Sequence, residues 1–271
     1  MTVRSADSAS RKAAGVAGKL ALALGSTVVA LAIALPLVRY LGYEADLRLL
    51  LPTAPCTPNP MAISDERLFH HVLTPCRRFV EEGFMDGNQR DQLEFRISVS
   101  ANSLGFRNDE YDVHKAPGTS RIVILGDSFT YGFGLDLEQT FFKKLEAKLT
   151  DQLQHKVEVW NLAVVSWATV IQERVVRERL QAYSPDVVVV AFDLSDFADN
   201  LAYVDALLPD GNFAKLEPGA LEKFWGHRGQ IHNSLRRITP MGESEYAALK
   251  DRGVELALHS LLRIAAMLRA A

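Results

Sequence analysis

The stretch that decides the fold is Ile122-Val123-Ile124-Leu125-Gly126-Asp127-Ser128-Phe129-Thr130. Its first four residues are apolar β-formers and the run stops at a glycine, which is typical of a buried strand that ends in a tight turn. Such a turn lifts the hydroxyl of Ser128 to the rim of a sheet, where a nucleophile has to lie. The pattern therefore predicts a strand over residues 121–125 with a reactive serine directly after it.

Strands and helices alternate after this turn. Apolar periodicity predicts helices near 138–150 and 168–183, and strands over 157–160 and 187–192. Apolar strands separated by amphipathic helices are typical of a parallel sheet that is covered on both faces. Right-handed crossovers then give an α/β fold, a doubly wound three-layer α/β/α sandwich of the flavodoxin-like type.

A polar cluster follows each of the three predicted strands. The clusters are Asp127-Ser128, Asn161 to Ser166, and Asp193 to Asp196. In an open α/β sheet, ligands bind at the carboxyl ends of the strands near the point where the strand order reverses. We therefore expect the three clusters to meet around one substrate atom.

The chain divides into four segments. Residues 1–19 are expected to be a cytoplasmic tail, 20–38 a transmembrane anchor, 39–93 a stalk or covering segment, and 94–271 the α/β domain. Residues 94–99 alternate polar and apolar, which predicts a half-buried strand, and Tyr246 to Ala270 predicts one or two helices. No fourth apolar strand follows, and a three-stranded sheet leaves one edge and part of a face uncovered. We therefore expect the domain to be incomplete at its C-terminal end.

The anchor is predicted from the 19 uncharged residues between Leu20 and Val38. At about 1.5 Å per residue, such a helix crosses a hydrocarbon core of roughly 30 Å. More basic residues precede the span than follow it, which predicts a cytoplasmic N-terminus and a periplasmic or extracellular main domain. A cleaved signal peptide is the alternative, although its apolar region is usually only about 7–15 residues long.

Composition gives no sign of a nucleic-acid-binding or metal-binding protein. The two cysteines are consistent with an exported domain. The 30 basic and 33 acidic residues give a net charge of −3, so nothing in the charge points to a nucleic acid partner. Cys56 and Cys76 are the only cysteines. They are expected to form one disulfide worth about 3 kcal/mol, with two unpaired thiols as the alternative. Two sulfurs without further ligands at suitable spacing make a poor metal site, so no metal is expected.

Four blocks together resemble the SGNH (GDSL-type) hydrolase family. They are Asn102-Ser103-Leu104-Gly105-Phe106-Arg107, Gly126 to Gly132, Asn161-Leu162-Ala163 and Leu194-Ser195-Asp196. They stand in the family's order and spacing over about residues 100–200. The resemblance implies esterase, lipase or polysaccharide O-acetyl chemistry on an acyl or acetyl ester, which includes saccharide esters, without a cofactor.

The resemblance assigns catalytic roles to three serines. Ser128 matches the nucleophile, and its own N–H matches one oxyanion donor. Ser166 stands where the second block normally has glycine, so its backbone N–H can still donate. Ser195 stands where the third block normally has asparagine, and a shorter hydroxyl replaces the amide. The loss of one oxyanion donor typically costs about 10²–10³ in rate.

Asp127, Asn161 and Asp196 are the candidate binding residues. Asn161 has the alternative of bonding only to loop backbone, and Ser195 and Asp196 have the alternative of capping the helix that follows them. Whether these residues bind substrate or support the backbone depends on which groups their side chains contact.

The family's general base comes from an Asp-x-x-His block near the C-terminus, and this sequence contains no such tetrad. A serine without a base is a weak nucleophile at neutral pH. The favoured interpretation is a membrane-anchored esterase truncated before its base. The alternatives are a degenerate domain that binds glycans without cleaving them, and an O-acetyltransferase partner in polysaccharide modification.

Overall fold

The computed structural model describes residues 63–66, 69–84, 93–213, 220–236 and 240–270. The chain divides at Pro52 into two units, and every described residue belongs to the second, Thr53–Ala271. The tail and anchor predicted over residues 1–38 lie outside the described residues. Among the described helices, none combines the length and the apolar character that a membrane crossing requires.

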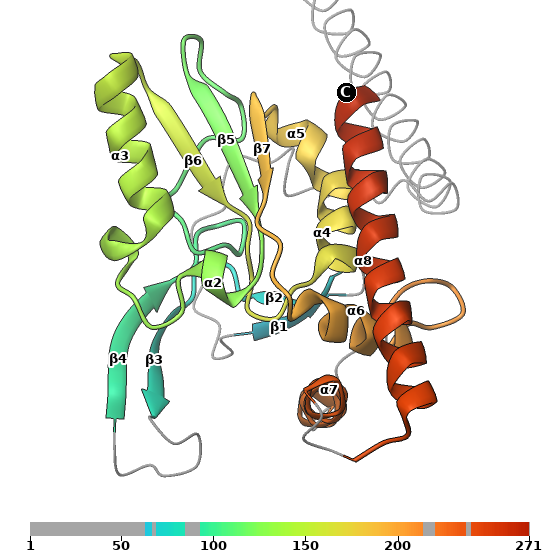
Figure 1. The fold of residues 1–271 in the computed structure, drawn as a ribbon. Coiled ribbons are helices and arrows are strands. Elements are labelled where there is room, and N and C mark those ends of the chain that lie inside the picture. The colour runs from blue at the N-terminus through green and yellow to red at the C-terminus, as the bar shows by residue number, and fades with distance from the viewer. Residues whose placement is uncertain (1–62, 67–68, 85–92, 214–219, 237–239, 271) are drawn as a thin grey trace, which may run out of the picture. The chain divides into compact units, whose positions relative to one another are not determined.

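A three-stranded parallel sheet forms the centre of this unit (Figure 1). Its strands are β5 (Ser120–Leu125), β6 (Val157–Asn161) and β7 (Val187–Val190). The strand order is β6-β5-β7, so the chain leaves β5 in one direction and returns across it to reach β7. The order reverses at β5, which places the switch point of the sheet at the carboxyl end of this strand.

One face of the sheet is covered by α3 (Phe141–Leu153), which follows the short η2 (Leu137–Gln139). Phe142 of α3 packs in one cluster with Ile124 of β5 and Val159 of β6. These residues alternate with side chains of the opposite face because successive residues of a strand point to opposite sides. The predicted amphipathic helix near 138–150 is confirmed, with its apolar stripe against the sheet.

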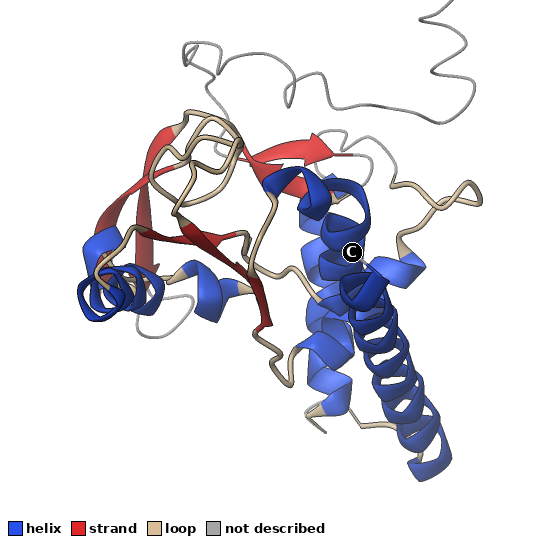
Figure 2. Cartoon of the chain, turned by 90° about the horizontal axis from the view of Figure 1, so that it is seen from above, coloured by secondary structure: helices blue, strands red, loops and turns tan. Residues whose placement is uncertain are grey.

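Further helices form the other side of the unit, as Figures 1 and 2 show. Trp160 of β6 reaches this side and packs on Tyr183, with ring centroids 5.0 Å apart. The helical elements are α4 (Thr169–Val175), the π-helical η3 (Val176–Leu180), α5 (Gln181–Tyr183), α6 (Asp196–Asp205), α7 (Ala220–Leu235) and α8 (Glu243–Ala270). The first three continue one another, which confirms the helix predicted near 168–183.

The cover over β7 is partial. Val187 and Val189 pair in register with Ile122 and Ile124 of β5, so all four side chains point to the α3 face. Val187 and Val189 are nevertheless 50% and 41% exposed, because α3 lies against β6 rather than over β7. The expectation that this strand is covered on both faces is therefore wrong, whereas the expected uncovered part of a face is confirmed.

Four strands precede the parallel sheet and form two antiparallel pairs. These strands are β1 (Ile63–Glu66), β2 (His70–Leu73), β3 (Arg78–Phe84) and β4 (Leu93–Ser100). The segment 39–93, predicted as a stalk or covering segment, thus contributes three strands, and β2 is buried along its whole length. Cys76 in this region is disulfide-bonded, and Cys56, the other cysteine of the sequence, lies outside the described residues.

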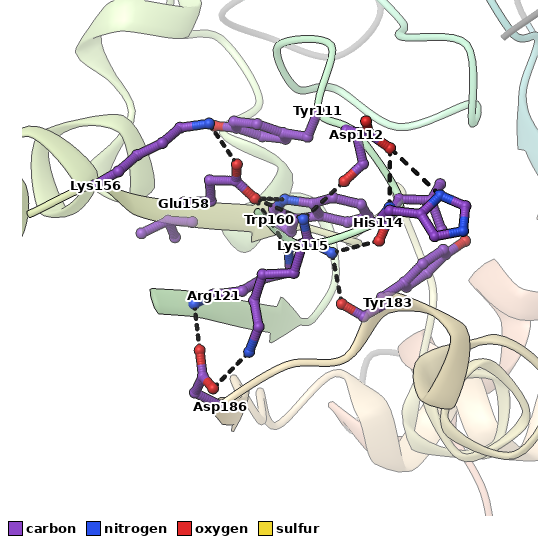
Figure 3. Close-up of polar contacts among 12 residues, drawn as sticks. Tyr111, Asp112, His114, Lys115, Arg121, Lys156, Glu158, Trp160, Tyr183 and Asp186 are labelled. Atoms are coloured by element: carbon purple, nitrogen blue, oxygen red, sulfur yellow. Dashed lines mark hydrogen bonds and ion pairs between the residues drawn. The ribbon is translucent and has the colours of Figure 1, made fainter. Parts of the chain in front are cut away.

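A buried ion pair ties the amino ends of the parallel strands together (Figure 3). Arg121 of β5 is fully buried and bonds to Glu158 of β6 through Nε at 3.0 Å and Nη2 at 2.8 Å. Its guanidinium also donates to three backbone carbonyls, those of Asp112, Val113 and Tyr183, and lies over the Trp160 ring. All N–H groups of the Arg121 guanidinium therefore have hydrogen-bond acceptors inside the domain. This ion pair lies at the opposite end of β5 from Ser128.

Gly253 of α8 lies where this helix crosses α6 and gives a first test of the packing. An alanine Cβ at this position would come within 2.8 Å of the Phe197 carbonyl oxygen. We expect Gly253→Ala to lower the free energy of unfolding by about 1–3 kcal/mol because it overpacks the contact. Urea denaturation measures this change.

Gly226→Ala in α7 is the control for this prediction. No atom of another residue lies within 4 Å of the added Cβ, so the change should stabilise the helix by up to about 1 kcal/mol. Equal effects of the two substitutions would contradict the packing.

Candidate functional site

The turn after β5 presents Ser128 as the first residue of the short helix α2 (Ser128–Tyr131). Asp127 is buried and its carboxylate accepts a hydrogen bond from the Phe129 amide at 2.9 Å. Asp127 therefore acts as the cap of this helix, whereas Ser128 is half-buried at the carboxyl end of the central strand. The predicted strand and turn are found in the expected order, with the half-buried Ser128 directly after them.

Arg107 holds the far end of the same turn in place. Its buried guanidinium donates to the carbonyls of Tyr131 at 3.3 Å and Gly132 at 2.6 Å, and also to that of Leu135. Gly132 has φ +81°, a conformation that glycine adopts without strain. The sequence placed Arg107 in a family-like block, but its role as a clamp on the nucleophile turn becomes visible only in the fold.

The second cluster is a loop that is bonded to the core on its inner side. Asn161 is fully buried, and its Oδ1 accepts from the Ala163 amide at 3.1 Å. Asn108 exchanges two hydrogen bonds with the Asn161 backbone, at 2.8 and 3.1 Å. The side chain of Asn161 thus supports the loop, which is the backbone alternative considered for this residue.

Ser166 lies in the same loop with φ +68°, in the left-handed region. A side chain is disfavoured there, which explains why glycine suits this position in proteins with the same block. The Tyr203 hydroxyl of α6 donates to the Ser166 carbonyl at 3.0 Å. Among the described residues, no acceptor is bonded to the amide of Ser166 or to that of Ser128. Neither N–H group is therefore used in a hydrogen bond within the described part of the chain.

The third cluster contains Ser195, whose backbone amide is bonded to a neighbouring carboxylate. The Ser195 amide donates to Asp193 Oδ1 at 2.7 Å. Burial opposes ionisation of Asp193, but hydrogen bonds from the hydroxyl and amide of Ser195 leave the pKa of this carboxyl below its ordinary value. Ser195 occupies the N-cap position of α6 without a side-chain capping bond.

Asp196 brings the first and third clusters together. It is fully buried, and its Oδ1 has no hydrogen-bond partner among the described residues. Burial, and next the carboxylate of Asp127, raise the pKa of Asp196 to about 8. Burial likewise raises the pKa of Asp127, and Asp193 adds to this rise. These mutual effects require the turns after β5 and β7 to be neighbours, as the switch point predicts.

The raised pKa of Asp196 gives a prediction about pH and stability. The folded protein binds a proton that the unfolded chain releases near about pH 4, so this stabilisation is complete below that pH. It is lost as the pH rises through the folded pKa of about 8. In Asp196→Asn the side chain stays uncharged, so the free energy of unfolding should fall less between about pH 5 and pH 9.

Chemical denaturation at the two pH values measures this difference. Asp205→Asn, on the same helix but with a side chain that is 36% exposed, serves as the control. A decline with pH that is as steep in Asp196→Asn as in the unaltered protein would contradict the assignment.

A buried carboxylate, Asp199, holds α7 against α6. It accepts two bonds from Arg228, at 2.6 and 2.9 Å, and one from His232 Nε2 at 2.6 Å. Within the part of the chain that the structure describes, no histidine is hydrogen-bonded to Ser128, and no group of three metal-ligating side chains comes together. Sequence reasoning did not predict this Asp–Arg–His contact, because its members lie on two separate helices.

The three turns lie within a region that matches a known family. The sequence profile described as GDSL-like lipase/acylhydrolase matches residues 122–259, from β5 into α8. The chain belongs to the GDSL-like lipase/acylhydrolase family. This confirms the resemblance found in the sequence, and membership supports ester or acyl hydrolysis as the general activity.

Solved structures similar to this GDSL-family chain were also found. The crystal structure of TesA is 16% identical, covers 54% of this chain and 73% of its own, and gives a TM-score of 0.29. That of AlinE4, described as an SGNH-hydrolase family esterase, is 16% identical over 55% and 75%, with a TM-score of 0.30. A GDSL-like lipase from Bacteroides thetaiotaomicron is 14% identical over 56% and 89%, with a TM-score of 0.19. Comparison with curated proteins gives no match.

Proposed function

We propose that this GDSL-family protein is a serine ester hydrolase in which Ser128 is the nucleophile. The observation that carries the proposal is the position of Ser128 at the carboxyl end of β5, the strand at which the strand order reverses. Ligands bind at this point of open α/β sheets. Ser128 is half-buried there, while the carboxylate beside it is occupied as a helix cap.

The chemistry follows from the groups at the three turns. Ser128 Oγ attacks the ester carbonyl as its proton passes to a general base, a role that no described histidine fills through a hydrogen bond to Ser128. The oxyanion that forms accepts hydrogen bonds from the unbonded amides of Ser128 and Ser166. The alcohol leaves with a proton, and water then releases the acyl group from Ser128. In this proposal the two backbone amides are the main oxyanion donors, because the Ser195 hydroxyl is shorter than the carboxamide that the family usually has at this position.

We further propose acyl and O-acetyl esters of envelope saccharides as substrates, for a protein anchored in the membrane with its main domain outside the cytoplasm. Support for the location comes from the uncharged segment Leu20–Val38 and from the disulfide at Cys76, which is typical of an oxidising compartment. The proposal for the substrate depends on this location and on the chemistry of the family.

A fluorophosphonate probe tests the proposed nucleophile in the full-length protein. We expect one covalent adduct, found by mass spectrometry on the peptide that contains Ser128, and hydrolysis of p-nitrophenyl acetate that the probe abolishes. Hydrolysis of an acetylated envelope polysaccharide, followed as released acetate, tests the substrate. Transfer of the acetyl group to a sugar rather than to water would identify a transferase instead.

A non-catalytic glycan-binding domain is the second candidate. The serine at position 195 favours it, since its short hydroxyl replaces the family's usual carboxamide donor. Saccharide binding without an adduct on Ser128 and without turnover of any acyl ester would select this candidate over the hydrolase.

A further inference from the structure

The buried histidine His71 contacts the loop that carries Ser166. His71 is fully buried in β2, and its Nε2 lies 3.0 Å from the carbonyl oxygen of Val165. A carbonyl oxygen only accepts, so Nε2 must carry the proton and donate it. The neutral ring then has its free lone pair on Nδ1, which lies 3.0 Å from Nδ1 of His70. His70 must therefore donate to His71, and the pair forms a directed chain of hydrogen bonds that ends on Val165.

Both imidazoles are neutral, as this chain requires. Burial, and next the neighbouring His71, lower the pKa of His70 to about 3. Burial also lowers the pKa of His71 to about 4, although the bond to Val165 and the nearby Asp199 oppose this. The tautomers are therefore fixed by geometry and stay fixed at neutral pH.

The bond from His71 determines which way the next amide points. The described chain contains no cis peptide bond, so the Val165 carbonyl and the Ser166 N–H of their shared peptide point in opposite directions. With the carbonyl held toward the buried ring of His71, the N–H points away from it. On the other side of Ser166, the hydroxyl of Tyr203 holds the Ser166 carbonyl from α6.

The hydrogen bonds from His71 and Tyr203 also explain how Ser166 keeps its left-handed backbone conformation. A non-glycine residue at φ +68° costs about 1–3 kcal/mol and persists only where its surroundings hold it. Each of the two carbonyls that flank its Cα accepts a bond from a buried side chain. Such strain is a common feature of sites in which a backbone amide has to be presented to a ligand.

We propose that His71 and Tyr203 are positioning residues that hold the Ser166 amide toward Ser128 as an oxyanion donor. The proposal rests on the proposed esterase function and adds two residues to it that touch neither substrate nor nucleophile. They act through the orientation of one peptide group, so they should affect the transition state rather than the binding of the ester.

Two amide substitutions at His71 test the role of Nε2. The glutamine amide of His71→Gln reaches the position of Nε2 and can still donate to Val165, whereas the shorter amide of His71→Asn cannot. In the full-length protein with p-nitrophenyl acetate, we expect His71→Asn to lower kcat by about 10–100-fold with an unchanged KM. His71→Gln should recover most of that loss. His70→Asn is the matched control and should have a smaller effect, because it leaves the bond from His71 to Val165 in place.

Tyr203→Phe tests the hydrogen bond from Tyr203 to the Ser166 carbonyl. This variant tests the proposal by itself if the His71 variants do not fold. It keeps the ring and removes the hydroxyl, so kcat should fall with KM unchanged. Equal kcat in His71→Asn, His71→Gln and the unaltered protein, or an unchanged kcat in Tyr203→Phe, would overturn the proposal. A Ser128→Ala variant distinguishes failure of the proposed esterase function from failure of the positioning role. If it retains full activity, the proposed function itself is wrong; if it is inactive while these variants are not, only the positioning role is wrong.

Discussion

Ser128→Ala is expected to lower kcat/KM for p-nitrophenyl acetate by about 10³-fold or more. Without the Oγ nucleophile, only substrate binding and the oxyanion donors remain to assist attack by water. The substitution removes one partly exposed oxygen at the start of α2 and leaves the Asp127 cap in place, so the fold should be unaffected. Steady-state kinetics with a thermal melt of the same sample separate loss of activity from loss of structure.

Ser120→Ala is the matched control for this experiment. Ser120 lies at the other end of the same strand, and its hydroxyl contacts Nε2 of His155 at 2.8 Å near the surface. Both variants lose a serine hydroxyl from the β5 region, but only Ser128 lies at the switch point. Activity of Ser128→Ala close to that of Ser120→Ala would rule out Ser128 as the nucleophile.

Arg121→Met should have the largest effect on stability, lowering the free energy of unfolding by about 3–5 kcal/mol. The substitution removes the buried partner of Glu158, whose side chain is only 3% exposed, and leaves this carboxylate with the largely exposed Lys156 as its ion-pair partner. It also leaves buried carbonyls without their donor, including that of Tyr183. Urea denaturation followed by far-UV circular dichroism measures the loss.

Arg96→Met provides the comparison at the surface. Arg96 also pairs with a glutamate, Glu82, but its side chain is 66% exposed, so its loss should cost at most about 1 kcal/mol. Combining Arg121→Met with Glu158→Leu removes both charges and should recover part of the stability. If the double variant were less stable than Arg121→Met alone, the buried charge would not be the source of the loss.

The sequence was informative where structure depends on neighbouring residues. The strand over 121–125, the turn at Gly126 and the helix over 168–183 follow from periodicity and breakers, which record the local burial of each face. The strand predicted over 187–192 is present as β7, but its expected cover on both faces was wrong, because an apolar run does not reveal how far α3 extends across the sheet. The segment 39–93 showed little periodicity, since short paired strands such as β2 are specified by their partners rather than by their own pattern.

Some features of the candidate site follow from local sequence, and others depend on the fold. By itself the sequence determined the order of the three polar clusters, their attachment to strand ends and the choice of Ser128, since each follows from a local run and the residue that ends it. Only the tertiary structure decided that Arg107 clamps the nucleophile turn, that Asp199 holds α7 against α6, and that His71 reaches Val165. Most of these are hydrogen bonds between buried groups far apart in the chain, and His71 lies 94 positions before Val165. A buried polar group must find a partner, but the fold alone decides which partner is within reach.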